Sequence, residues 1–510
     1  MKFLNYIAVS LAIFTMASCD DNVEAVRTGG DNDKLTIQHQ FGKNLVGRVT
    51  VDGVPREGVV VSDGITVMTT DANGEYQMYT TGRQHVFISV PEDCEVPVFN
   101  GHPKFYKTLD FSNDAIIQRD FQLRSCNKKT EWTLFTMADV QIGNGDVNDY
   151  SNVVMPQILD FTQTLTNNAY GINVGDIVWN TPSLFETYKS QVAKTLIPTF
   201  NVIGNHDHNE GIKNDTESDR DYRNALGPTY YSVNIGDCHL VVLDDVLYRG
   251  IDGRNDYSGT ITQAQLDWLE KDLSYVSKDK MIIIGVHIPT KRRNRSTQLT
   301  NNQALYDLVK DFKEVQILSG HTHNNFTTTI ADNITETTFG AVMGAYWYPL
   351  CNDGSPRGYA VLKFNGNRLV DKYYRGAATP RDYQMEIYPP SEAVMWQKDA
   401  KAGDPYDKIL VNIFAWHSTW TVEIQEDGGA WTTLSDSDRL VPTAARPCWD
   451  PRIHLQVNED GVLDANHGGS APENYNDHMF LYKPASSWKN VTVRATDPFG
   501  NVYTSSLDNK

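Results

Sequence analysis

The chain has 510 residues, more than one hydrophobic core ordinarily supports, so we expect two to four domains. Hydrophobic residues make up 40% of the chain, which favours a globular protein over a disordered one. The formal net charge of −19 excludes nucleic-acid binding through a general basic surface, so any anionic ligand must be held by a local feature.

The first residues follow the pattern of an export signal. Met1 and Lys2 precede the apolar run IAVSLAIFTMAS, which is too short to span a membrane and ends in small residues before Cys19. This ending resembles the lipobox of bacterial lipoproteins. The resemblance implies a signal peptide over residues 1–18 and a lipid anchor on Cys19 of an exported protein, periplasmic or at the cell surface. A plain secretory signal with an incidental Cys19 is the alternative, and residues 19–34 are expected to form a flexible tether.

Residues 35–125 alternate apolar and polar side chains, as half-buried strands do. Asp-Gly or Asn-Gly pairs at 52–53, 63–64 and 73–74 are typical of tight hairpin turns. The run from Gly47 through PREGVVVSDG to TTDANGEYQM resembles the small transthyretin-like or carboxypeptidase-regulatory-like β-sandwich. We therefore expect a β-sandwich that serves as a spacer or docking module.

The cysteine content favours no zinc finger, because no CxxC or Cys/His knuckle occurs. Besides Cys19 the chain has an odd number of cysteines, which excludes complete pairing within the chain. Cys94 and Cys126 lie in one small region and could form a disulfide in an exported protein, although their spacing alone does not establish one.

Residues 130–376 alternate short apolar runs, rich in β-formers, with longer segments of helical periodicity. The segments of helical pattern are 155–168, 182–196, 262–276 and 302–312. Such alternation predicts an α/β layer fold with buried sheets, in which ligands gather at the carboxyl ends of the strands. Residues 377–403, rich in Pro, Asp and Ala, indicate a linker, and residues 404–510 a second β-sandwich.

Five apolar runs of this α/β region end on side chains able to bind a metal ion. They end, in chain order, on Asp139, on Asp176, on Asn205, His206 and Asp207, on His287, and on His321 and His323. One such ending is more often a turn or a packed histidine, but five in one block indicate a shared site. Two neighbouring cations repel each other, so a bridging carboxylate such as Asp176 is needed, with imidazoles and oxygens completing shells for zinc, manganese or iron. In extended backbone His321 and His323 would point the same way.

The order Asp-x-Gln, Gly-Asp, Gly-Asn-His-Asp, His, Gly-His-x-His resembles that of the calcineurin-like metallophosphoesterase superfamily. The resemblance covers about residues 130–376 and implies an α/β sandwich of two sheets flanked by helices, between two smaller all-β sandwich domains. It also implies two divalent metal ions, which can be Mn, Fe, Zn or Mg. The first would be held by Asp139, Gln141, Asp176 and His323, and the second by Asp176, Asn205, His287 and His321. His206 would lie over the substrate phosphate, with Asp207 orienting it.

Gln141 departs from the family pattern, which usually has histidine there. Glutamine is neutral and its carbonyl oxygen binds hard cations, so the charge of the site is kept while its affinity for softer metals falls. In extended backbone Asp139 and Gln141 would lie on the same side and reach the same ion. A decayed, inactive site is the alternative. The segments GDIVWN and GNHDHN also lack the sequence signatures of the serine/threonine protein phosphatases.

Two flanking segments bear on the substrate. The segment KRRNR, which includes Arg292 and Arg293, follows His287 and could hold an anionic group beyond the scissile phosphate, or could be a solvated basic loop. The aromatic segment around Trp347 could be a platform for a ring-bearing leaving group, or could pack between domains.

The residues and the resemblance together predict a phosphoric ester hydrolase. It would use a dinuclear centre and a metal-activated hydroxide on a phosphate mono- or diester outside the cytoplasm. One alternative is a nucleotide or lipid-headgroup phosphodiesterase. Another is a surface binding protein built on a decayed phosphoesterase scaffold.

Overall fold

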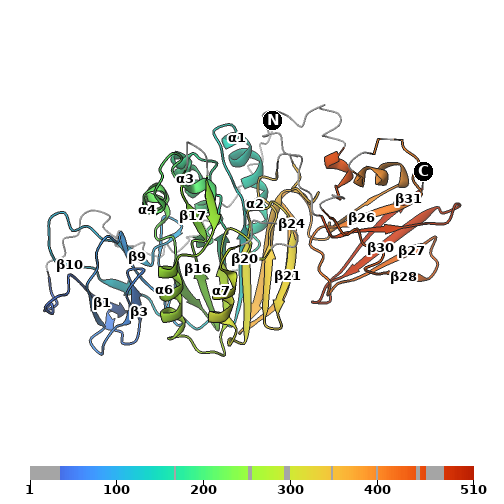
Figure 1. The fold of residues 1–510 in the computed structure, drawn as a ribbon. Coiled ribbons are helices and arrows are strands. Elements are labelled where there is room, and N and C mark those ends of the chain that lie inside the picture. The colour runs from blue at the N-terminus through green and yellow to red at the C-terminus, as the bar shows by residue number, and fades with distance from the viewer. Residues whose placement is uncertain are drawn as a thin grey trace, which may run out of the picture.

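The computed structural model describes residues 35–165, 168–250, 256–291, 299–345, 349–397, 400–401, 403–443, 448–454 and 476–509. An α/β domain lies in the middle, with a β-rich domain on each side (Figure 1). The predicted fold class, an α/β sandwich between two smaller all-β domains, is confirmed.

The N-terminal domain consists of two small sheets and a hairpin. Its strands are β1 (Leu45–Val51), β2 (Val54–Pro55), β3 (Val60–Ser62), β4 (Val67–Thr69), β5 (Glu75–Met78), β6 (His85–Ile88), β7 (Val98–Phe99), β8 (His102–Pro103), β9 (Tyr106–Thr108), β10 (Ile117–Gln118) and β11 (Phe121–Leu123). One sheet has the order β10-β1-β11, with β2 and β5 also paired to β1, and the other has the order β4-β3-β6-β9. Phe105 packs on Tyr231 of the central domain, with ring centroids 4.6 Å apart, and Trp268 donates to Ser62 Oγ at 3.1 Å. The two domains therefore share one buried core.

The central domain contains two sheets packed face to face. The first is formed by β12 (Glu131–Met137), β13 (Ala169–Asn173), β14 (Thr199–Asn201), β23 (Gly358–Asn365) and β24 (Arg368–Gly376), in the order β14-β13-β12-β23-β24. The second is formed by β15 (Tyr231–Ile235), β16 (Cys238–Val242), β19 (Met281–Gly285), β20 (Glu314–Ser319), β21 (Phe326–Ala331) and β22 (Ile334–Thr338), in the order β15-β16-β19-β20-β22-β21. Strands β12 to β14 run parallel, as do β16, β19, β20 and β22, so their carboxyl ends meet at one edge. A separate hairpin joins β17 (Val246–Tyr248) to β18 (Tyr257–Gly259).

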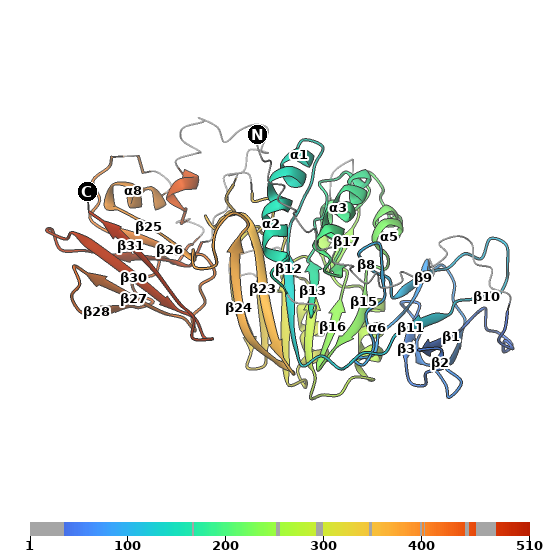
Figure 2. The same ribbon diagram turned by 180° about the vertical axis from the view of Figure 1, so that it is seen from behind.

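Helices cover both outer faces of this sandwich, and the first sheet faces the reader in Figure 2. The first sheet packs on α2 (Met155–Thr162), α3 (Phe185–Val192) and α5 (Arg220–Leu226), and the second on α6 (Gln263–Leu273) and α7 (Asn302–Val309). Short turns complete the set: α1 (Val147–Asp149), η1 (Tyr150–Val154), η2 (Pro182–Leu184), η3 (Ala193–Thr195), η4 (Asn205–Asp207) and α4 (Asp215–Ser218). The four segments of helical pattern thus form α2, α3, α6 and α7. Within the described residues, no helix combines the length and apolarity that a membrane crossing requires.

The C-terminal domain has two sheets. They contain β25 (Met385–Tyr388), β26 (Ile409–Ile413) and β29 (Met479–Tyr482), and β27 (Thr421–Glu426), β28 (Trp431–Leu434), β30 (Asn490–Thr496) and β31 (Val502–Asp508). The stretch 377–403, interpreted as a linker, differs from that prediction because it holds β25, α8 (Pro390–Ala393) and η6 (Val394–Trp396). Its prolines do not break structure here, since Pro390 occupies the first turn of α8, where no backbone N–H is required.

The structure also answers the question of a disulfide in the N-terminal domain. Cys94 and Cys126 are both thiols. Burial raises the pKa of Cys94 to about 12, so this thiol stays protonated and unreactive at neutral pH.

Candidate metal centre

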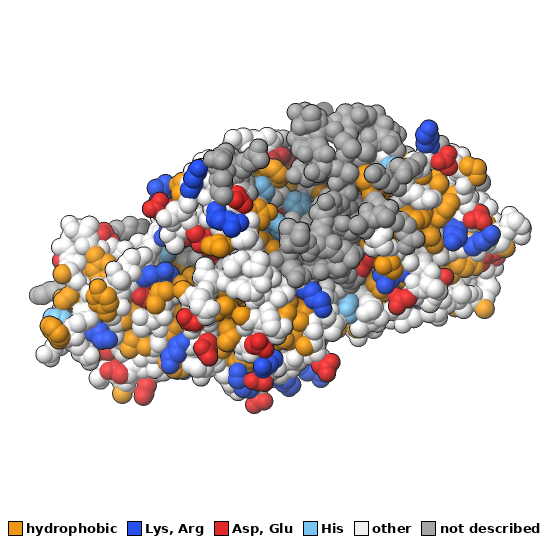
Figure 3. All heavy atoms as spheres, viewed as in Figure 1, with side chains coloured by type: hydrophobic (Ala, Val, Ile, Leu, Met, Phe, Trp, Pro, Cys, Tyr) orange, Lys and Arg blue, Asp and Glu red, His pale blue; other side chains and the backbone are white. Residues whose placement is uncertain are grey.

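The side chains predicted to bind metal come from loops at the carboxyl edge of both sheets. Asp139, Asp176 and Asn205 follow β12, β13 and β14 of the first sheet, and His287 and His321 follow β19 and β20 of the second. Because the two sheets are packed together, these loops meet over the core. Histidine side chains are gathered on this part of the central domain's surface (Figure 3).

Four of these residues form one tight group. His287 Nε2 lies 3.2 Å from Asp176 Oδ2, 3.1 Å from Asn205 Oδ1 and 3.2 Å from His321 Nδ1. His287 Nδ1 lies 2.9 Å from the carbonyl oxygen of Val174, to which it donates, so Nε2 is the ring nitrogen that faces the group. The structure therefore brings together all the side chains predicted for the second ion.

The side chains predicted for the first ion lie beside this group. Asp139 accepts the backbone N–H of His321 at 2.9 Å, and His323 Nε2 is 3.4 Å from Asp139 Oδ1. Gln141 Nε2 donates to Asp176 Oδ2 at 2.8 Å, so the glutamine side chain reaches the shared carboxylate. The positions of Oε1 and Nε2 in a glutamine amide are assigned from the hydrogen bonds around it. A cation beside Asp176 would favour the flipped Gln141 amide, in which Oε1 faces the cation.

The expectation of extended backbone at Asp139, Gln141, His321 and His323 is wrong. Left-handed φ angles occur at Asp139 (48°), Gln141 (41°), Asp176 (51°), His321 (68°) and His323 (54°). The physical reason is that β12 ends at Met137 and β20 at Ser319, before the residues in question, so the side chains converge through tight turns. Left-handed backbone is costly for residues with a Cβ and persists only where surrounding contacts fix it. The accumulation of such residues is typical of a functional site.

The donor set fits divalent cations. Asp139 and Asp176 are fully buried, and within the described residues neither carboxylate has a Lys or Arg within ion-pair distance. Burial lowers the pKa of His287, but the charges of Asp176 and Asp139 outweigh it and raise that pKa to about 10. The carboxylates thus attract positive charge, and a metal ion supplies it better than a proton because imidazole nitrogens and oxygens already surround the position.

His206 stands beside the group without joining it. Its backbone N–H donates to Asp176 Oδ1 at 2.9 Å, whereas its imidazole stacks on Trp179, with ring centroids 4.4 Å apart, and its Nδ1 lies 2.8 Å from Asn180 Oδ1. Asn180 therefore takes the orienting role predicted for Asp207. The carboxylate of Asp207 instead accepts the backbone N–H groups of residues 177, 178 and 204, which fastens the loop of His206 to the loop of Asp176.

Several residues that support the site were not predicted from the sequence. Trp179 and Asn180 end the segment GDIVWN. Their position shortly after the Gly-Asp pair could have indicated that they lie near the site. Asp245 ends the apolar run HLVVLDD and accepts the backbone N–H groups of His287 and Ile288, at 3.0 and 2.9 Å. Arg292, Arg293 and Trp347, predicted to face the substrate, lie outside the described residues, as does Cys19.

Three models of one family match consecutive parts of the chain. The N terminal of calcineurin-like phosphoesterase matches residues 43–126, calcineurin-like phosphoesterase matches 137–325, and the C terminal of calcineurin-like phosphoesterase matches 336–503. A curated relative, the "probable glycerophosphodiester phosphodiesterase GpdQ" of Arcobacter nitrofigilis, is 26% identical over 178 residues, which are 34% of this chain and 59% of the relative. The chain thus spans about three fifths of that relative's length.

Solved structures of similar fold include a dimetal phosphatase from Danio rerio and a purple acid phosphatase from yellow lupin (Lupinus luteus). The first is 15% identical and covers 48% of this chain and 96% of its own, with a TM-score of 0.37. The second is 13% identical and covers 63% and 67%, with a TM-score of 0.38. The family assignment rests on the family models, which cover the metal-binding loops and both flanking domains. The chain belongs to the calcineurin-like phosphoesterase family.

Proposed function

We propose that this enzyme hydrolyses a phosphate mono- or diester outside the cytoplasm, with a centre of two divalent metal ions. The observation that carries the proposal is the convergence of two buried carboxylates and three histidines from loops of both sheets. The first ion would be held by Asp139, Gln141, Asp176 and His323. The second would be held by Asp176, Asn205, His287 and His321.

The chain's own residues have separate roles in this proposal. Two bound cations would supply positive charge to the phosphoryl oxygens and activate water as the nucleophile. Asp176 belongs to both shells and keeps the cations together. His206, with Nδ1 held by Asn180, would present Nε2 to the phosphate or to the leaving oxygen, and a phosphate beside it would favour the charged imidazole that donates there.

An assay on two chromogenic substrates tests the proposal. The chelated enzyme is supplied with Mn, Zn, Fe, Mg or Ca, and hydrolysis of p-nitrophenyl phosphate and of bis-p-nitrophenyl phosphate is measured alongside metal content. We expect metal-dependent hydrolysis of at least one substrate and two ions per chain. Absence of hydrolysis with every metal would favour a surface binding protein on a decayed scaffold.

A phosphodiesterase of nucleotides or lipid headgroups is the second candidate. The name of the curated relative supports it, since that protein is described as a probable glycerophosphodiester phosphodiesterase. Trp179 also supports it, because its ring lies on His206 and is 37% exposed, which suits contact with a second ester group. A preference for the diester over the monoester in the same assay distinguishes this candidate.

Gln141 is expected to bias the first site toward hard cations such as manganese or magnesium. Gln141→His should keep activity and shift metal preference toward zinc or iron, because imidazole is the softer donor. Gln141→Ala should weaken binding of the first ion by about 10–100-fold, as loss of a ligand or its support usually does. Metal titration of the chelated variants measures both. If both variants match the wild type in metal preference and affinity, the glutamine is not a ligand.

Membrane anchoring through Cys19 is a proposal that rests on the lipobox-like sequence alone. Cys19→Ala should move the protein from the membrane fraction to the soluble fraction, because the apolar run before it is too short to span a bilayer. Immunoblotting of the two fractions measures the shift. Continued retention of the variant in the membrane fraction would show that another attachment is responsible.

A further inference from the structure

The turn that carries His323 is hydrogen-bonded to a later segment of the chain, residues 352 and 353. The backbone N–H of Asn352 donates to the carbonyl oxygen of His323 at 2.9 Å, and Asn352 Nδ2 donates to that of Thr322 at 3.0 Å. Asp353 Oδ2 accepts the backbone N–H of Asn325 at 2.7 Å. Both sides of His323 are therefore fixed by residues 352 and 353.

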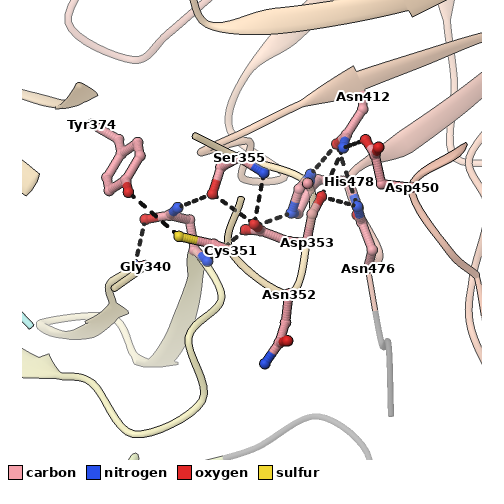
Figure 4. Close-up of polar contacts among 12 residues, drawn as sticks. Gly340, Cys351, Asn352, Asp353, Ser355, Tyr374, Asn412, Asp450, Asn476 and His478 are labelled. Carbon is pink, nitrogen blue, oxygen red and sulfur yellow. Dashed lines mark hydrogen bonds and ion pairs between the residues drawn. The ribbon is translucent and has the colours of Figure 1, made fainter. Parts of the chain in front are cut away.

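Asp353 is fixed in turn by the C-terminal domain. Its carbonyl oxygen accepts from Asn412 Nδ2, on β26, and from Asn476 Nδ2, just before β29, each at 2.7 Å. Its carboxylate lies 3.4 Å from His478 Nε2. In Figure 4 the Asp353 side chain lies between Ser355 and this group from the C-terminal domain. The C-terminal domain thus holds the backbone of Asp353, and Asp353 holds the turn of His323.

The residues of this connection are buried and hydrogen-bonded to one another. Asp353, Ser355, Asn412 and Asn476 are all buried. Asp353 Oδ1 accepts both the backbone N–H and the hydroxyl of Ser355, at 2.9 and 2.6 Å, and Asn412 Nδ2 also donates to a buried carboxylate of the C-terminal domain. Such buried hydrogen bonds hold their partners in place, because loss of one bond leaves a polar group without a partner and away from water.

His323 needs such support. Its φ of 54° is left-handed, and a residue with a Cβ keeps that conformation only where its surroundings impose it. The turn THN contains no glycine, the residue that adopts this conformation without steric cost. The hydrogen bonds from Asn352 and to Asp353 hold the backbone on both sides of His323, and Asp139 contacts its side chain.

We propose that Asp353 is a positioning residue for His323, and that the C-terminal domain sets the geometry of the first metal site through Asn412 and Asn476. The inference rests on the proposed function in taking His323 as a ligand of the first ion. According to this inference, the C-terminal domain helps to form the metal site and is not merely an appended module.

The test compares cross-domain contacts of the same kind. Asn412→Ala and Asn476→Ala each remove one donor to the carbonyl of Asp353. Asn501→Ala is the matched control, because Asn501 Nδ2 donates across the domains to Asp371 Oδ1 at 3.0 Å, on β24 and away from the metal-binding loops. Asn476→Ala leaves the other donor in place, so it keeps the test available if Asn412→Ala does not fold.

Two measurements are made on the full chain after chelation. Titration with Mn²⁺ should show two ions in the wild type, and in the Asn412 and Asn476 variants about 10–100-fold weaker binding of one ion with the other unchanged. Hydrogen exchange of the metal-free protein should show faster exchange of the Asn325 amide in these variants, because its acceptor Asp353 is loosened. The Asn501 variant should match the wild type in both.

The outcomes separate this inference from the proposed function. Wild-type metal affinities and wild-type exchange at Asn325 in both variants would overturn the positioning role, while two ions in the wild type would leave the proposed function standing. An equal effect of Asn501→Ala would also overturn it, since any loss at the domain interface would then suffice. Fewer than two ions in the wild type would contradict the proposed function, and the exchange measurement would still decide whether the C-terminal domain holds the turn.

Discussion

Asp176→Asn should abolish turnover and leave the enzyme with greatly reduced metal content. Asp176 is fully buried, its Oδ2 is 3.2 Å from His287 Nε2, and it accepts the amide of Gln141 at 2.8 Å. In the proposed function Asp176 is the shared carboxylate and would supply negative charge to both ions, and asparagine keeps its shape without that charge. Removing one partner of a buried charge pair costs about 3–5 kcal/mol, or about 10²–10⁴-fold in binding.

Metal content by mass spectrometry and hydrolysis rates measure the effect of Asp176→Asn. The matched control is Asp272→Asn, since Asp272 is also buried and pairs with a histidine, with its Oδ2 2.8 Å from His239 Nε2, on helix α6. That control should lose stability and keep its metal ions. Wild-type activity in the Asp176 variant would show that Asp176 is not a ligand of the site.

The convergence of the metal-binding residues could be predicted because it follows from strand ends. An apolar run that stops at a polar residue marks where a buried parallel strand leaves its sheet, and parallel strands end at the same edge. Asp139, Asp176 and Asn205 meet for that reason, and the second sheet brings His287 to the same place. Periodicity gave the four main helices in the same way.

The conformation of the loops could not be predicted, because it depends on contacts between distant residues. Asp139 adopts a left-handed φ while its carboxylate holds the backbone of His321, 182 positions later. The ring of His206 is set by Asn180 rather than by its neighbour Asp207, and adjacency in sequence gave the wrong partner. A local sequence pattern does not predict contacts between residues so far apart in the chain.

His206→Ala should lower kcat by about 10²–10⁴-fold, the usual range for a positioned acid–base group, and leave metal content near the wild-type value. The two effects separate because the residue contacts the centre through its backbone. The N–H that donates to Asp176 Oδ1 remains in the alanine variant, whereas the imidazole held by Asn180 and Trp179 is lost.

His208→Ala is the matched control for His206→Ala. His208 lies two positions later, is buried, stacks on Tyr248 with ring centroids 4.6 Å apart, and has Nδ1 2.8 Å from Ser218 Oγ. Its loss should lower the melting temperature through lost packing and leave the chemical step intact. If His206→Ala instead removes both metal ions, His206 is a ligand and its role at the leaving group is wrong. If it keeps both ions and the full rate, the imidazole takes no part in the reaction, and Asn180 orients a side chain that the chemistry does not need.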